Sequence, residues 1–81
     1  MTGPSEAMEA MAERLEAVAE ELGDMALDAL RRAGSGDPDS AETGRALAQE
    51  RRLLQARRAV EKSVAALRQG SAGAAFDDGA A

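Results

Sequence analysis

The sequence predicts an all-α protein, an antiparallel two-helix hairpin that pairs with a second copy into a four-helix bundle. Two long stretches, 5–33 and 40–69, consist of helix-forming residues with apolar side chains at helical spacing. One run of turn-forming residues, 34–39 (GSGDPD), separates them. The two stretches also carry opposite net charges, which favours their docking against each other.

The first helix is expected over 5–33. Ser5 is a natural N-cap, and Glu6 and Glu9 follow it near the positive end of the helix dipole, where carboxylates are stabilised. Two Arg residues lie in the last turn and Gly34 comes just after it. Basic residues followed by Gly are typical of a helix C-terminus.

The second helix is expected over 40–69. Asp37 and Pro38 can supply its N-cap and its first helical residue. Asp39, with Glu42 three residues later, offers an alternative start that resembles a capping box. The sequence leaves these two starts open.

The two ends of the chain are expected to lie outside the hairpin. Residues 1–4 form a flexible N-terminus, and residues 70–81 are small and acidic, which predicts a disordered tail. Phe76 stands beside Asp77 and Asp78, a composition typical of short peptides that dock into a groove on another protein. An inert C-terminal extension is the favoured interpretation of this segment.

Apolar side chains form a regular seam on the first helix, in alternating steps of three and four residues. This rhythm is typical of a helix packed almost parallel to its neighbour. Ala12, Ala19 and Ala26 flank the seam. The second helix has a weaker pattern: one row recurs every seven residues, and Leu47 and Leu54 form another row about 100° away. Two rows predict two packing partners.

Large apolar residues are scarce, because 20 of the 36 hydrophobic residues are Ala. A lone hairpin therefore has little to bury, and self-association into a homodimer is the expected remedy. The predicted self-association seam consists of Met8, Met11, Leu15, Val18, Leu22, Met25, Leu30, Leu47, Leu53, Leu54, Val60, Val64 and Leu67.

Charge is divided unequally between the two helices. The stretch 5–33 holds eight acidic residues and three Arg, whereas 40–69 holds three acidic and seven basic residues. Exposed ion pairs contribute only about 0–1 kcal/mol each, so their larger role is to select partner and register. The acids of the first helix form an acidic ridge that comprises Glu6, Glu9, Glu13, Glu16, Glu20, Asp24 and Asp28.

Leu27 falls inside the acidic ridge, where the hairpin alone does not explain an apolar residue. It is therefore a candidate contact for another protein. The predicted partner surface consists of Leu27, Glu13, Glu16, Glu20 and Asp24. These carboxylates could also be taken for a metal site, but acids spaced along a helix are typical of a solvated face, so no metal is expected.

Composition argues against several functions. The chain has no Cys and no His, which removes thiolate sites and the usual general base, so neither an enzyme nor a cofactor is expected. No apolar run approaches the length of a membrane span, and no signal peptide is apparent, so a cytoplasmic location is expected. The net charge of −5 disfavours nucleic acid and anionic membranes as partners of the whole surface.

The function predicted from these features is a non-enzymatic interaction or assembly module, a small adapter. The alternative is a nucleic-acid-binding regulator that uses a basic stripe on the second helix, formed by Arg51, Arg58 and Lys62. In architecture the predicted dimer resembles small helical hairpins that bind RNA across one face of a bundle, with no residue motif in common. Solvated side chains, or pairs with the acidic ridge, are the simpler explanation of the stripe.

Overall fold

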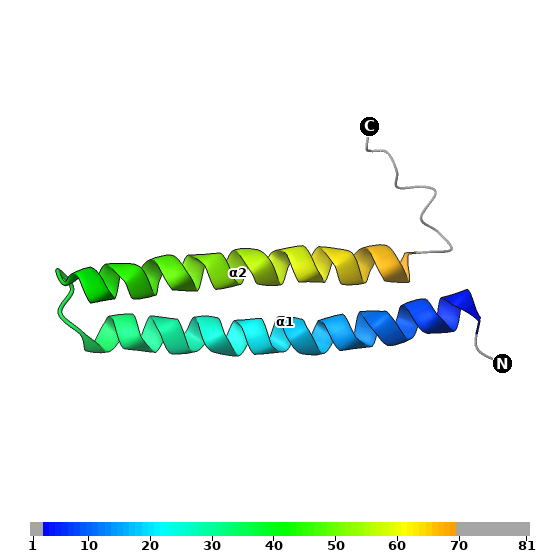
Figure 1. Cartoon of the computed structure of the whole chain (residues 1–81), viewed down its shortest axis with the longest axis horizontal. Helices are drawn as coiled ribbons and strands as arrows, with labels where there is room; N and C mark the ends of the chain where they lie inside the picture. Colours follow the sequence, from blue (N-terminus) through cyan, green and yellow to red (C-terminus); the bar gives the residue numbers. More distant parts are fainter. Residues whose placement is uncertain (1–2, 70–81) are drawn as a thin grey trace, which may run out of the picture.

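The computed structural model describes residues 3–69, which form two long helices, α1 (Pro4–Ser35) and α2 (Ala41–Arg68). At 1.5 Å per residue the helices are about 48 Å and 42 Å long. They lie side by side and antiparallel, joined by one short turn (Figure 1). The predicted all-α helical hairpin is confirmed. The predictions made for residues 1–2 and 70–81, including the tail peptide at Phe76, lie outside the described residues.

Helix α1 begins one residue earlier than expected. Gly3, not Ser5, occupies the N-cap position, and it provides no side-chain cap. Pro4 is the first helical residue, where its fixed φ suits the helix and its missing N–H costs nothing. The first helical hydrogen bond then runs from the Ala7 N–H to the Gly3 carbonyl, at 3.0 Å.

Helix α1 also ends later than expected, because it continues through Gly34 to Ser35. Gly36 follows in an extended conformation, with φ −105° and ψ −177°, so no left-handed glycine ends the helix. The nearby proline supplies a physical reason for the end. Pro38 cannot continue a helix and disfavours the α conformation of Asp37 before it.

The turn residues explain why neither predicted start of α2 is used. The Ser40 N–H donates to the Asp37 carbonyl, and the Asp39 N–H donates to Asp37 Oδ1, both at 3.0 Å. Asp37 is therefore committed to a turn with Pro38 at its second position. Ser40 is the N-cap instead, and its Oγ accepts from the Thr43 N–H at 3.0 Å.

The hairpin contact is centred on alanine. Five alanines of α1 face α2 and are buried. Against them α2 packs Ala46 and Val64, which are buried, and Leu53, Val60 and Leu67, which are half-buried. The sequence predicted that the alanines would only flank the seam, but they form its middle. Small side chains let two helices approach closely, so they occupy the line of nearest contact. The buried residues of α1 are Ala12, Ala19, Ala26, Ala29 and Ala33.

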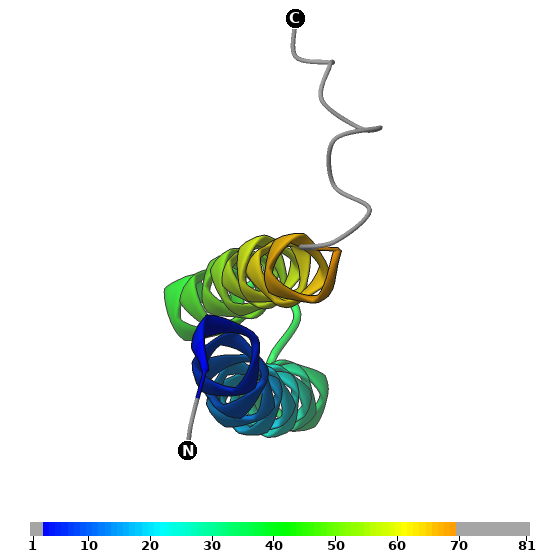
Figure 2. The same ribbon diagram turned by 90° about the vertical axis from the view of Figure 1, so that its right-hand side faces the viewer.

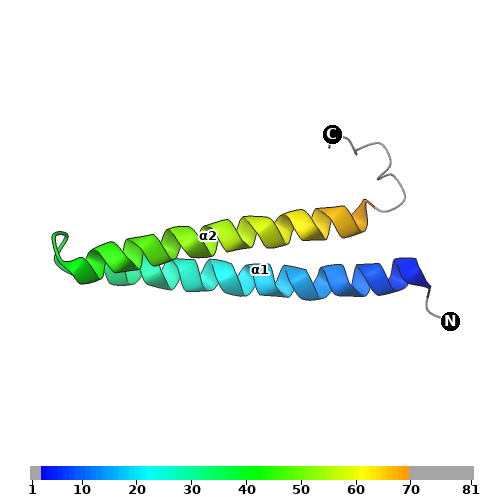
Figure 3. The same cartoon turned by 45° about the horizontal axis from the view of Figure 1, so that its top comes forward.

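Two contacts fix the register of the helices. The guanidinium of Arg57 lies against Gly23, and Arg32 Nη2 donates to Gln49 Oε1 at 3.0 Å. Residues of α1 and α2 whose numbers add up to about 80 therefore lie at the same level along the hairpin. The view nearly along the helices shows them as a single pair (Figure 2), and the tilted view shows them crossing at a small angle (Figure 3).

Candidate protein-interaction surfaces

Three rows on α1 define the two sides of the hairpin. Residues seven apart lie on nearly the same face of a helix, so each row keeps its side along the whole contact. The buried alanines form the central row. Met11, Val18 and Met25 flank it on one side, and Glu9 and Glu16 flank it on the other.

The apolar ridge, which comprises Met11, Val18 and Met25, is exposed. Its three side chains are 43%, 41% and 54% exposed, which is high for residues of a predicted core seam. Of the other large seam residues on α1, Leu15 and Leu22 are half-buried against α2. The seam therefore splits, because the alanines take the central line and turn the apolar ridge outward.

Small side chains of α2 lie on the same side as the apolar ridge. Arg32 lies seven residues after Met25, so its hydrogen bond to Gln49 places Gln49 on this side. Ala56 and Ser63 follow Gln49 at seven-residue steps and therefore lie on the same side. Ala59 and Ala66 lie on the next row outward. We call Ala56, Ala59, Ser63 and Ala66 the small row; all four are exposed. Large apolar side chains and small side chains thus lie next to each other along this side.

The opposite side carries a charged clamp near the open end. Arg68 Nε and Nη2 donate to the two carboxylate oxygens of Glu9, at 3.0 and 2.7 Å, and Nη1 donates to Glu16 at 2.5 Å. Hydrogen bonds from the guanidinium lower the pKa of Glu9 below its ordinary 4.5, and the two carboxylates raise the pKa of Arg68. Glu16, predicted as part of a partner surface, is thus engaged within the hairpin.

Large apolar residues gather on this same side near the turn. Leu30 lies seven residues after Gly23, and Leu47 lies in the α2 row that ends at Arg68. By the register of the helices, Leu30 is level with a point between Leu47 and Leu54. The structure thus places Leu30 and Leu47, which the sequence assigned to the self-association seam, on the same side as Leu27, which it assigned to the partner surface. We call Leu27, Leu30 and Leu47 the turn-end patch; their side chains are 47%, 46% and 36% exposed.

The other members of the predicted partner surface, Glu13, Glu20 and Asp24, are exposed. Glu20 also lines a shallow groove with Glu16 and Arg57. Glu20 and Asp24 lie along α1 between the charged clamp and the turn-end patch, and Glu13 lies at the level of the clamp. Within residues 3–69, no group of three or more potential ligand side chains is placed to hold a metal ion.

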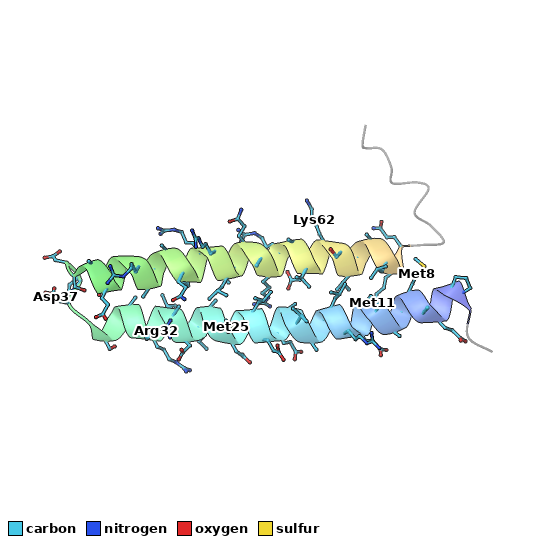
Figure 4. All side chains as sticks on the ribbon, viewed as in Figure 1. Met8, Met11, Met25, Arg32, Asp37 and Lys62 are labelled. Atoms are coloured by element: carbon cyan, nitrogen blue, oxygen red, sulfur yellow. The ribbon has the colours of Figure 1, made fainter. Side chains whose placement is uncertain are left out.

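The basic stripe, which comprises Arg51, Arg58 and Lys62, is exposed along α2. Lys62 projects away from α1 (Figure 4). Among the residues that the structure describes, no carboxylate forms an ion pair with any of the three. The pairing of the stripe with the acidic ridge, considered from the sequence, is therefore absent within this hairpin, and the pairing of Arg68 with Glu9 and Glu16 takes its place.

Sequence reasoning missed three residues of the contact. Glu50 and Arg57 are half-buried, because they lie in a row with Thr43 and Val64 that faces α1. The seven-residue spacing of this row was a usable signal, but the charges concealed it. Thr43 was missed as well: its side chain is buried, and Oγ1 donates to the Asp37 carbonyl at 2.7 Å while it accepts from Ser40 Oγ at 3.0 Å.

Neither α1 nor α2 is both long and apolar enough to cross a membrane, as far as residues 3–69 are concerned. No family model matches the chain, and no curated protein or solved structure matches it either.

Proposed function

We propose that this chain is a non-enzymatic interaction and assembly module whose hairpin is completed by a second copy of itself. The observation that carries the proposal is the exposure of Met11, Val18 and Met25 along one side of the hairpin. Exposed apolar side chains in a contiguous strip mark a surface that another protein covers.

The composition of the core supports the need for that cover. Within residues 3–69, the buried apolar residues are six alanines and Val64, and no large side chain is fully buried. Burial stabilises in proportion to the apolar area removed from water, at about 25 cal/mol per Å². A core of alanines therefore contributes little, and packing of the apolar ridge against a second hairpin adds burial without ordering a further element.

The adapter function then falls to the other side of the hairpin. The turn-end patch is separated from the apolar ridge by the helices themselves, so dimerisation through the apolar ridge leaves it free. Leu27 is the outermost member, next to the exposed carboxylates Glu20 and Asp24. We expect a second protein to dock here, in the cytoplasm, with apolar residues that face the patch and basic residues that face the carboxylates.

Light scattering after size-exclusion chromatography tests the assembly. The full chain at micromolar concentration is expected to have twice its own mass of 8.4 kDa. The substitution Val18→Glu, on the apolar ridge, is expected to give monomers, because it places a charge in the interface. The matched control is Ala17→Glu, which adds the same charge one residue away on the exposed outer face. A wild-type monomer, or equal effects of the two substitutions, would contradict the proposal.

Nucleic-acid binding is the second candidate, favoured by one observation: the basic stripe is exposed and has no ion pair within the described residues. The net charge of −5 opposes it. Labelled RNA and duplex DNA titrated at several salt concentrations separate the candidates, because a phosphate binder loses affinity steeply as salt rises. Loss of that binding in Arg51→Gln/Arg58→Gln would support the second candidate.

A further inference from the structure

We infer that the two hairpins of the dimer pack with their turns at the same end, so that α1 of each chain contacts α2 of the other. The inference rests on the proposed function, because it requires a dimer formed through the apolar ridge. Two symmetric arrangements cover that side. A two-fold axis parallel to the helices places the turns together, whereas an axis perpendicular to them places the turns at opposite ends and packs α1 on α1.

The sizes of the side chains favour the arrangement with both turns at one end. It places the apolar ridge of one chain over the small row of the other. By the register of the helices, Met25 is then level with the region of the partner's Ala56, and Val18 lies between the levels of the partner's Ala59 and Ser63. Large side chains meet small ones, which is how facing helices interdigitate.

The opposite-end arrangement fits less well for the same reason. It packs the apolar ridge on the apolar ridge and the small row on the small row. The first contact crowds Met and Val side chains together and holds the hairpins apart, so the second leaves alanines and Ser63 facing each other across a gap. Both overpacking and voids destabilise a core.

The charges of the helices favour the same choice independently. The segment 5–33 has a net charge of −5 and the segment 40–69 has a net charge of +4. When α1 packs on the partner's α2, acidic and basic helices alternate around the bundle. When α1 packs on α1, the two acidic helices become neighbours, as do the two basic ones. Like charges at an interface disfavour that arrangement.

Distances between spin labels distinguish the two arrangements. The chain has no cysteine, so a single Ser35→Cys substitution gives one label per chain next to the turn. With both turns at one end, the labels lie across one bundle, below about 35 Å apart, since neighbouring helix axes are 8–10 Å apart. With the turns at opposite ends, the labels are separated by a helix length, about 45 Å or more.

A second label at Glu6→Cys, which is exposed in the first turn of α1 near the open end of the hairpin, provides the matched measurement. Short distances from both labels, in samples that scatter light as dimers, support the inference. Dimers with distances of about 45 Å or more overturn the inference and leave the proposed function standing. Samples that remain monomeric overturn the proposed function, and the inference with it.

Discussion

The guanidinium of Arg57 lies over the backbone of Gly23, so that a Cβ atom at residue 23 would be 2.9 Å from Arg57 Nη1. This contact explains why a helix interior contains a glycine: the missing side chain leaves room for a half-buried charge from α2. Gly44, a glycine within α2, has no such neighbour within 4 Å. The two glycines therefore predict different responses to substitution.

Gly44→Ala is expected to stabilise the hairpin by about 0.5–1 kcal/mol, because alanine restricts the unfolded chain and favours the helix. The position is exposed and open, so the added methyl group meets nothing. Thermal unfolding followed by circular dichroism measures the effect, which corresponds to about 4–8 °C per kcal/mol in a domain of this size. An unchanged or lower midpoint contradicts the expectation.

Gly23→Ala is expected to stabilise less than Gly44→Ala, because the methyl group must displace the end of the Arg57 side chain. In an Arg57→Ala background the obstacle is gone, and the substitution should recover the full gain of about 1 kcal/mol. Chemical denaturation of the four variants of this cycle measures the coupling. Equal gains in the two backgrounds would show that Arg57 does not rest on Gly23 in solution.

The ion pair between Glu9 and Arg68 predicts a dependence of stability on pH. The pKa of Glu9 is lowered in the folded state, so its contribution is complete above the ordinary pKa of 4.5 and is lost as the pH falls through the lowered value. Arg68→Gln is expected to reduce this loss on acidification. Carboxyl NMR titration should show the pKa of Glu9 rising toward 4.5 in the variant.

The matched control for this titration is Arg14→Gln, which removes the same charge from the exposed surface of α1. It is expected to leave the Glu9 titration nearly where it was, since the hydrogen bonds from Arg68 are the largest cause of the shift. A similar rise of the Glu9 pKa in both variants would assign the shift to net charge and not to the pair.

The hydroxyl of Thr43 is expected to stabilise the turn. Thr43→Val keeps the shape of the side chain but removes two hydrogen bonds: the one that the Thr43 hydroxyl donates to the Asp37 carbonyl, and the one that it accepts from the Ser40 hydroxyl. We expect a loss of about 1 kcal/mol in the free energy of unfolding. Thr43→Ser retains the hydroxyl and should retain the hydrogen bonds, so it is expected to be more stable than Thr43→Val. Denaturation curves in which Thr43→Val is as stable as the wild-type chain would contradict a stabilising role of the hydroxyl.

The proposed dimer predicts that thermal stability depends on protein concentration. Dilution favours the monomer by mass action, so the unfolding midpoint of the wild-type chain should fall as concentration is lowered. In Met25→Glu, which disrupts the apolar ridge, the midpoint should be lower and independent of concentration. A wild-type midpoint that stays constant over a hundredfold dilution would speak against self-association.

The sequence was sufficient for the fold class, because helix formation and the turn depend on neighbours in the chain. Apolar residues at steps of three and four, and a run of turn formers between the two stretches, predicted two antiparallel helices. The helix starts were less predictable. Asp37, Asp39 and Ser40 all suit an N-cap, and only the turn geometry shows that Asp37 is used in the turn and Ser40 caps α2.

The sequence by itself determined that two amphipathic helices of opposite charge fold back on each other. The tertiary structure decided how each helix is rotated about its axis. A seam flanked by alanines is compatible with several rotations, since each one buries some apolar side chains. The contact between two helices selects the rotation that brings them closest, which placed the alanines inside, the apolar ridge outside, and Arg57 over Gly23.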